Sequence, residues 1–340
     1  MKKYMAITIA AIALIALIGI GAWSLQDSGK DYSGKMDSIN IGTVPVYAAA
    51  LIYIAEDQQF FEENGIIINV TDYPTGIATT DAMLMGDTDL AWVAEFPLVR
   101  MAFAKDEIAV IAVVGRFQEQ YLFGRNDRGI HRIANFEGKK IGIPRNTIAE
   151  FYLGRYLQLH GIDKRNITLV DVGAAESLDA IVNGRVDGVV AWEPFSSQIR
   201  MQMADHVIAL PIQNNQPGYG TVVGRTEWLQ GHPNVVHRFL TSLYQAETYC
   251  TRNPAAAKEI MRNRLNFDEA FTETIWSENQ ISLSLDQSLI VAMEDEGRWM
   301  IANNMTNATQ VPDFTRFIST ESLENEKPGS VNIISGNGGP

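Results

Sequence analysis

The chain has 340 residues, of which 46% are hydrophobic and 20% are charged, a composition typical of one large or two ordinary globular domains. The formal net charge of −13 argues against a nucleic-acid or other polyanionic partner, because such partners require a clustered basic surface. Cys250 is the only cysteine, which excludes an internal disulfide and a cysteine-based metal cluster, and we expect it to be a buried, unreactive thiol.

The first elements in the chain are an apolar segment and a polar connection. Two lysines follow the first methionine, and no charge then occurs from Tyr4 to Gln26. About nineteen apolar residues at ~1.5 Å each span roughly 28 Å, close to the ~30 Å hydrocarbon core of a bilayer. We therefore expect residues 1–24 to be a membrane anchor, with a cleaved signal peptide as the alternative. The lysines place the remainder outside the cytoplasm, and residues 25–37 have the composition of a flexible tether.

Strand-like and helix-like segments then alternate in two successive sets. The first set predicts strands at 38–44, 66–73 and 88–94, with helices at 47–65, 76–85 and 97–104. The second set predicts strands at 139–144, 167–172 and 186–192, with helices at 147–160 and 174–183. This alternation predicts βαβ units in two α/β lobes, followed by a mostly helical region at 233–304 and an irregular C-terminus.

A sixteen-residue segment occurs twice, as DAMLMGDTDLAWVAEF at 81–96 and as DAIVNGRVDGVVAWEP at 179–194. In each copy a predicted helix ends at a glycine, Gly86 or Gly184, because glycine tolerates the positive φ of a helix terminus. Each copy then forms a strand that runs out at a glutamate, Glu95 or Glu193. Ligands bind at the carboxyl ends of strands in open α/β sheets, so both glutamates are candidate ligand contacts. The alternative is that the repeat reflects only the packing of βαβ units.

Threonines stand at three predicted strand-to-helix junctions, at Thr43, Thr75 and Thr147. The free N–H groups of a helix start can hold an anion, although simple N-capping is a common role for threonine. Three such junctions together favour a small-molecule site, and Trp192 and Tyr219 are candidate walls of its pocket. No nucleophile elbow, P-loop or H-E-x-x-H motif occurs, and the five histidines show no metal-ligand spacing.

Taken together, several segments resemble the nitrate/sulfonate/taurine group of ABC-importer substrate-binding proteins over roughly residues 38–265. The segments are PVYAAALIYIAEDQQFFEENGIIINV, YPTGIATTDAMLMGDTDLAWVAEFP, FEGKKIGIP, TIAEFYLGRYLQLHGI and GRVDGVVAWEPF. The resemblance implies a two-lobed type II periplasmic-binding-protein fold, with a parallel-dominated sheet flanked by helices in each lobe. Crossovers near Gly124 and Gly220 would divide the chain into one lobe of residues 38–123 and 221–320, a second of 124–220, and an irregular tail of 321–340.

The resemblance also implies a ligand site between the lobes. Together with the position of Tyr219, it assigns ligand contacts to Tyr47, Thr75, Gly76, Glu95, Phe96, Thr147, Trp192, Glu193 and Tyr219. Two facing glutamates would repel a simple anion such as nitrate, and the junctions offer few cations besides Arg145 and Arg116. We therefore expect a zwitterion such as taurine, or a neutral heterocycle of the thiamine-pyrimidine type, in addition to the sulfonate and nitrate that the group name implies.

The implied function is an extracytoplasmic substrate-binding protein, without cofactor or metal, that works as a monomer. It would deliver its small-molecule ligand to a permease and an ATPase on other chains, and attach to the membrane through its N-terminal segment. An enzyme on the same fold is the alternative. The pyrimidine-precursor synthase of thiamine biosynthesis carries a CCCFC motif that this chain lacks, and the menaquinone-pathway enzymes are cytoplasmic, which conflicts with export.

Overall fold

The computed structural model describes residues 32–334. The anchor or signal peptide predicted at 1–24, the first part of the tether and the last six residues lie outside this range. Within it, no helix is both long enough and apolar enough to cross a membrane.

The first sheet has five strands in the order β2-β1-β3-β10-β4. They are β1 (Asp37–Thr43), β2 (Ile66–Asp72), β3 (Leu90–Ala94), β4 (Ile108–Phe117) and β10 (Gly218–Arg225). β1 pairs in parallel with β2 and β3, whereas β10 lies antiparallel between β3 and β4. Residues 118–120 lead from β4 to the second sheet, and residues 212–217 lead back from it to β10.

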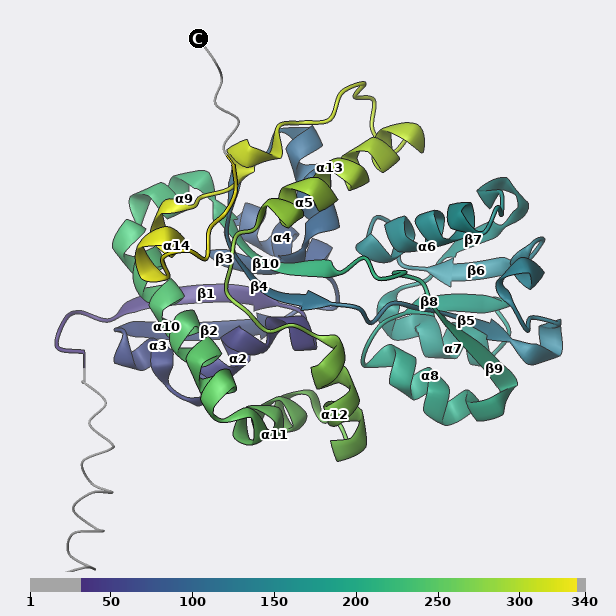
Figure 1. The fold of residues 1–340 in the computed structure, drawn as a ribbon, viewed down its shortest axis with the longest axis horizontal. Coiled ribbons are helices and arrows are strands. Elements are labelled where there is room, and N and C mark those ends of the chain that lie inside the picture. The colour runs from purple at the N-terminus through teal and green to yellow at the C-terminus, as the bar shows by residue number, and fades with distance from the viewer. Residues whose placement is uncertain (1–31, 335–340) are drawn as a thin grey trace, which may run out of the picture.

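The second sheet repeats this arrangement in the order β7-β6-β8-β5-β9 (Figure 1). Its strands are β5 (Tyr121–Arg125), β6 (Lys140–Ile143), β7 (Thr168–Asp171), β8 (Gly188–Ala191) and β9 (Val207–Pro211). β6 pairs in parallel with β7 and β8, and β5 is antiparallel to β8 and β9. The expectation of parallel-dominated sheets is therefore corrected, because both sheets are mixed. The strand that follows each connection between the sheets, β5 or β10, is antiparallel to both of its neighbours.

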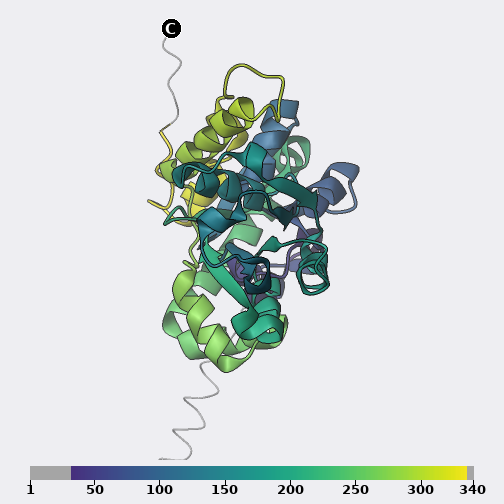
Figure 2. The ribbon, with the colours of Figure 1, turned by 90° about the vertical axis from the view of Figure 1, so that its right-hand side faces the viewer.

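Helices cover both sheets, and the views of Figures 1 and 2 show them on the outside of each sheet. In chain order, the first helices are α2 (Ala50–Asp57), α3 (Phe60–Glu63), α4 (Gly76–Met85), α5 (Glu95–Ala104), α6 (Ile148–Leu159) and α7 (Ser177–Val182), of which α6 and α7 belong to the second sheet. The others are α8 (Phe195–Met203), α9 (Thr226–Gly231), α10 (Pro233–Arg252), α11 (Pro254–Leu265), α12 (Glu269–Glu278), α13 (Gln287–Ala302) and α14 (Glu321–Glu326).

Two segments differ from the helical pattern predicted from the sequence. Residues 47–65 form a 3-10 turn (Tyr47–Ala49), α2 and α3 rather than one helix, because Gln59 adopts a left-handed φ of 60° between α2 and α3. The tail expected to be irregular contains α14, whose Leu323 is fully buried and which packs against α10. A helix this short is not stable in isolation, and burial of the Leu323 side chain stabilises it.

The two copies of the sequence repeat occupy equivalent places in the two sheets. Gly86 and Gly184 follow α4 and α7 with φ values of 87° and 71°, as a helix-ending glycine requires. The aspartate three residues after each glycine accepts a backbone hydrogen bond from the neighbouring parallel strand: Asp89 from the N–H of Asn40 in the middle of β1, and Asp187 from the N–H of Lys140 at the start of β6. The repeat thus encodes the register between a new strand and its parallel neighbour in both sheets.

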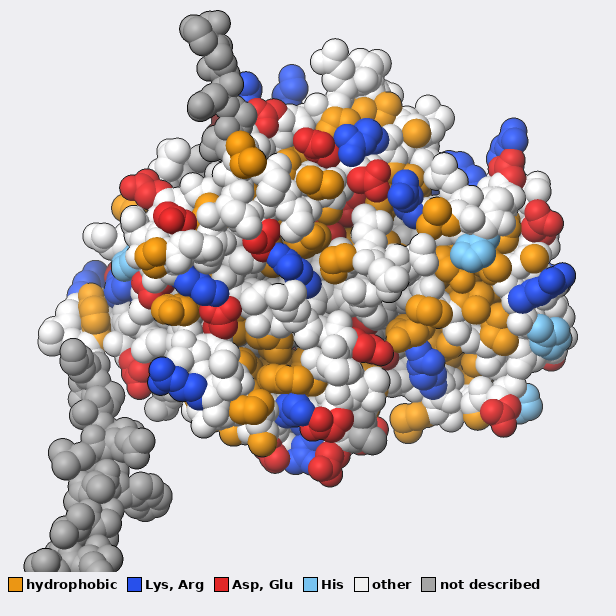
Figure 3. Space-filling view, in the orientation of Figure 1, with side chains coloured by type: hydrophobic (Ala, Val, Ile, Leu, Met, Phe, Trp, Pro, Cys, Tyr) orange, Lys and Arg blue, Asp and Glu red, His pale blue; other side chains and the backbone are white. Residues whose placement is uncertain are grey.

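The interior is apolar, and the surface carries charges of both signs. Every residue of β8 is buried, and the apolar clusters of both sheets are fully packed. Cys250 is buried in α10, which confirms that part of the prediction, and burial raises the pKa of its thiol to about 12. On the face shown in Figure 3, acidic and basic side chains are intermixed and form no continuous basic surface.

Candidate functional site

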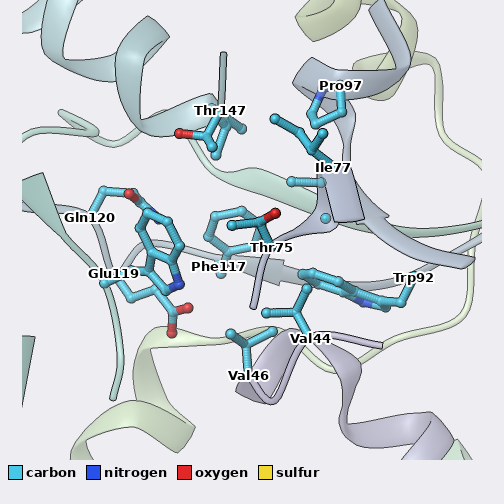
Figure 4. A pocket seen from close by; sticks show the side chains of 14 residues that line it. Val44, Val46, Thr75, Ile77, Trp92, Pro97, Phe117, Glu119, Gln120 and Thr147 are labelled. Carbon is cyan, nitrogen blue, oxygen red and sulfur yellow. The ribbon is translucent and has the colours of Figure 1, made fainter. Parts of the chain in front are cut away.

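A cavity of about 50 Å³ lies where the two sheets and the first connection meet (Figure 4). Because one water requires about 10–15 Å³ of such volume, the cavity has room for about four water-sized groups. The residues that line it are Val44, Val46, Thr75, Gly76, Ile77, Trp92, Ala94, Pro97, Phe117, Glu119, Gln120, Thr147, Ile148 and Trp192. They come from both halves of the fold, so the cavity depends on how the halves meet.

Two helices, one from each half, begin at the cavity. Thr75 is the N-cap of α4, and its hydroxyl accepts a hydrogen bond from the N–H of Ala78 at 3.2 Å. Thr147 occupies the N-cap of α6, but its hydroxyl donates to the carbonyl of Pro144 at 2.8 Å and caps no helical N–H. The positive ends of both helix dipoles therefore reach the cavity, which favours an oxoanion there.

Aromatic rings form much of the cavity wall, and they come from Trp92, Phe117 and Trp192. Trp92 is held in place because its indole N–H donates to the carbonyl of Ala48 at 3.2 Å. Trp192 packs edge-on against Phe195 at 6.3 Å between ring centroids. Flat, fixed rings of this kind exclude water and offer stacking surfaces to a small ligand.

The first connection contributes two buried polar side chains, Glu119 and Gln120. Within the described residues, Oε2 of Glu119 and Oε1 of Gln120 have no hydrogen-bond partner. Burial, and to a lesser extent the negative charge of Glu193, raises the pKa of the Glu119 carboxyl to about 8. The connection itself is fixed by Gln213, which accepts from the N–H of Gln120 at 3.0 Å and donates to the carbonyl of Phe117 at 2.9 Å.

The basic residues near the site are engaged elsewhere. Arg145 pairs with Glu150 at 3.0 Å, and Arg116 pairs with Asp286. No lysine or arginine is among the residues found to line the cavity in the described part of the chain. Within residues 32–334, no group of three or more His, Cys, Asp or Glu side chains is placed to hold a metal ion.

Comparison with known proteins identifies the family. The family model described as NMT1/THI5 like matches residues 47–257. The chain belongs to the NMT1/THI5-like family. This membership agrees with the resemblance seen in the sequence.

Relatives of this NMT1/THI5-like protein are distant. A protein of Bacillus subtilis that is named for aliphatic sulfonate binding is 23% identical over 279 residues, which cover 81% of this chain and 82% of that protein. The bicarbonate-binding protein CmpA of Synechococcus elongatus is 22% identical over 285 residues, which cover 74% of this chain and 63% of CmpA.

Solved structures show the same fold. The alkanesulfonate-binding protein SsuA from Xanthomonas axonopodis pv. citri, bound to MOPS, superposes with a TM-score of 0.73 at 16% identity, covering 85% of this chain and 100% of that one. The desulfurization enzyme DszB superposes with a TM-score of 0.65 at 14% identity, covering 85% of this chain and 98% of that one. The NMT1/THI5-like chain therefore has the type II periplasmic-binding-protein fold, which binding proteins and at least one enzyme share.

The structure brings four of the nine residues proposed from the sequence to the cavity, namely Thr75, Gly76, Thr147 and Trp192. The other five are not among the residues that line the cavity, namely Tyr47, Glu95, Phe96, Glu193 and Tyr219. Tyr47 is buried with its ring stacked on Phe267 at 6.1 Å, and burial raises the pKa of its hydroxyl. Phe96 packs on Phe151 at 6.0 Å in the core.

Glu95 and Tyr219 are joined to each other. Oε2 of Glu95 accepts a hydrogen bond from the N–H of Tyr219 at 2.9 Å, and burial raises the pKa of the Glu95 carboxyl to about 8. The ring of Tyr219 lies below the guanidinium of Arg116 at 5.4 Å. These contacts couple the end of β3 to the start of β10.

Glu193 is bound at the start of α8. Its carboxylate accepts hydrogen bonds from the hydroxyl of Ser196 and, at 3.1 Å, from the N–H of Ser197. Both partners belong to the first turn of α8, so this carboxylate caps the helix. The ligand contact predicted for Glu193 stays a prediction, and Thr43 likewise has a local role, donating to Asp72 at 2.8 Å.

Glu119 and Gln120 were not among the residues proposed from the sequence. The available signal was the polar triplet of residues 118–120 between two apolar segments, close to the predicted crossover at Gly124. Polar triplets between strands usually lie in exposed turns, and here only Gln118 is exposed, because the meeting of the two sheets buries Glu119 and Gln120.

Proposed function

We propose that this chain is the substrate-binding protein of an ABC importer, which captures a small solute outside the cytoplasm and delivers it to a permease. The observation that carries the proposal is a cavity built jointly by both sheets and their connection. A ligand enclosed there would contact both halves at once, which is how closure of a two-lobed protein is coupled to ligand binding.

An oxoanion suits one side of the cavity. The starts of α4 and α6 supply N–H groups at Gly76, Thr147 and Ile148 and the hydroxyl of Thr75, and the relatives named for sulfonate and bicarbonate binding have oxoanion ligands in their names. We therefore propose a sulfonate- or carboxylate-like group as part of the ligand. A thiamine-pyrimidine-like heterocycle remains the second candidate, because Trp92, Phe117 and Trp192 can enclose a flat ring.

A binding role is favoured over catalysis by the chemistry of the cavity wall. Among the described residues that line it there is no cysteine, histidine, serine or lysine, and the hydroxyls of Thr75 and Thr147 are engaged in hydrogen bonds at the helix starts. A nucleophile activated by an adjacent histidine or lysine is therefore missing from the lining. DszB is an enzyme with the same fold, so the fold alone does not distinguish binding from catalysis. The binding role is therefore supported by the residues that line the cavity.

The wider organisation follows from this role. We propose a monomer with one lobe of residues 38–123 and 221–320, a second of 124–220, and hinges at residues 118–120 and 212–217. The permease and the ATPase would be separate chains, and residues 1–24 would anchor the protein to the membrane or direct its export. Loss of cognate uptake on deletion of the chain is the result expected from this arrangement.

Replacing Trp192 by alanine is expected to weaken ligand binding about 10-fold, because a ring that encloses the ligand is removed. Titration calorimetry of the purified full-length chain with sulfonates measures the affinity, with one ligand bound per chain. Trp228→Ala is the matched control, since Trp228 stacks on His232 away from the cavity. Turnover of the bound ligand, or equal affinities in both variants, would contradict the proposal.

A further inference from the structure

Four Asn-x-Thr triplets occur in the chain, and none has proline at its middle position. They begin at Asn69, Asn166, Asn304 and Asn307. In exported proteins this triplet is the acceptor pattern for N-linked glycans, which attach to the asparagine amide at the protein surface. Because the triplet also occurs by chance, its place in the fold decides whether it is accessible. All four asparagines are exposed, as an acceptor must be.

Three of the four asparagines lie in turns outside the strands. Asn166 ends the 3-10 turn between α6 and β7, and Asn304 and Asn307 follow the end of α13. Within residues 32–334, the side-chain amides of these three asparagines make no hydrogen bond. Their amide nitrogens are therefore available on the folded protein, at loop positions of the kind that accept modification.

Asn69 differs from the other three because it lies inside a strand. It stands in β2 opposite Asn40 of β1, and its side-chain amide donates to Oδ1 of Asn40 at 3.1 Å. Both the backbone and the amide nitrogen of Asn69 are thus engaged. We expect Asn69 to be a poor acceptor, so it provides an internal comparison for the three loop asparagines.

The loop asparagines lie beside a groove that both halves of the fold form. Nζ of Lys164, two residues before Asn166, donates to Oδ1 of Asn303 at 2.5 Å, and Asn304 is the next residue. Lys164 and Asn303 line a surface groove of about 630 Å³ between α6 and α13. Figure 1 shows the ends of α6 and α13 at the upper right, on the opposite side from the start of β1. None of these residues lines the ligand cavity, so glycans here would leave it open.

We propose that the exported protein carries N-linked glycans on Asn166 and on at least one of Asn304 and Asn307. The inference rests on the export that the proposed function requires, because the transferase and its donor lie in the membrane and act outside the cytoplasm. Glycans are bulky, so they would keep a protein partner, including the permease, away from the groove.

The donor class is a glycan joined through its anomeric carbon to a polyprenyl phosphate. Nδ2 of the asparagine forms a bond to that carbon, and the bond between the carbon and the phosphate oxygen breaks. The lipid phosphate leaves with the electron pair, and one amide proton passes to a base of the transferase. The transfer therefore involves no oxidant or reductant.

Mass spectrometry of the full-length chain, isolated from outside the cytoplasm of its natural host, tests the proposal. Peptides that contain Asn166 and residues 304–309 are expected to be heavier by whole numbers of sugar residues. Electron-transfer fragmentation should assign the added mass to the asparagines. The Asn69 peptide is expected to have the mass of its sequence, as is every peptide of the same chain produced in a bacterial cytoplasm that lacks the transferase.

Substitutions of Thr168 separate transfer at the triplet from other modifications. Thr168→Val keeps Asn166 and the size of the side chain but removes the hydroxyl of the acceptor pattern, so the glycan on Asn166 should be lost. Thr168→Ser keeps a hydroxyl and should retain the glycan. Thr168 is exposed, so neither variant is expected to unfold. Thr251→Val, at an exposed threonine outside these triplets, is the matched control.

The outcomes distinguish this inference from the proposed function. Sequence masses for all three loop asparagines in the exported chain, with sulfonate binding intact, would overturn the inference and leave the binding function standing. A glycan on Asn69 alone, or added mass at Asn166 that persists in Thr168→Val, would also overturn it. Recovery of the wild-type chain only from the cytoplasm would contradict the proposed function, and the glycosylation with it.

Discussion

Replacing Glu296 by glutamine is expected to stabilise the protein at pH 8 and to change its stability little at pH 5. Glu296 lies on α13 and is fully buried, and neither of its carboxylate oxygens has a hydrogen-bond partner among the described residues. Burial raises the pKa of this carboxyl well above its usual value, and the carboxylates of Glu95 and Asp295 raise it further.

The direction of the effect follows from proton binding. An acid whose folded-state pKa is raised holds its proton in the folded protein while the unfolded chain releases it near pH 4.5. The stability that this proton confers is complete below that pH, and is lost progressively as the pH rises toward the folded pKa. Glutamine reproduces the shape of the protonated carboxyl but does not titrate. The stability of Glu296→Gln is therefore not expected to fall as the pH rises.

Thermal unfolding of the full-length chain at pH 5, 6.5 and 8 measures this difference. Glu294→Gln is the control, because Glu294 is a partly exposed residue of the same helix that pairs with Arg298 at 3.5 Å. Wild type and Glu296→Gln should diverge as the pH rises, whereas Glu294→Gln should follow wild type. Parallel profiles for all three proteins would show that Glu296 does not carry the pH dependence.

Local sequence patterns predicted much of the fold, because the ends of helices and the positions of strands depend on residues that are close together in the sequence. Glycines at 86 and 184 ended helices where positive φ was required, and the apolar runs before Glu95 and Glu193 became β3 and β8. What the patterns could not predict was pairing between distant segments. β10 inserts antiparallel between β3 and β4, and β5 does the same between β8 and β9, so neither sheet is parallel-dominated.

The candidate site was predicted only in part, for a related reason. Thr75 and Thr147 stand at helix starts that local spacing locates, and both line the cavity. Glu95 and Glu193 end equivalent strands, but their carboxylates are occupied by the N–H of Tyr219 and by the first turn of α8. Glu119 faces the cavity because two sheets close over a short connection, and no local pattern encodes that burial.

Helices α6 and α13 form a contact that does not involve the residues lining the cavity. Gly154 of α6 packs directly on Trp299 of α13: a Cβ at Gly154 would lie 2.4 Å from Cζ2 of the indole. The same ring stands perpendicular to Phe151 of α6 at 5.5 Å. Since α6 begins at the cavity with Thr147 and Ile148, any displacement of α6 from α13 also moves the start of α6.

Gly154→Leu is therefore expected to weaken ligand binding about 100-fold, because the added side chain pushes α6 off Trp299 and removes the hydrogen bonds that the start of α6 offers to the oxoanion. Titration calorimetry with the sulfonate that the wild-type protein binds most tightly measures the loss of affinity. Small-angle scattering should show that the unliganded variant is more open than the unliganded wild type. Gly231→Leu is the control, since nothing lies within 4 Å of a Cβ at Gly231.

A second substitution separates lost closure from lost folding. Trp299→Ala removes the ring that the leucine would strike, so Gly154→Leu combined with Trp299→Ala is expected to recover most of the affinity, as coupled neighbours do in a double-mutant cycle. If Gly154→Leu were merely unfolded, its circular dichroism would differ from wild type and a second core truncation would make it worse. Unchanged affinity in a folded Gly154→Leu variant would mean that the contact between α6 and α13 plays no part in binding, and that the cavity closes by other contacts.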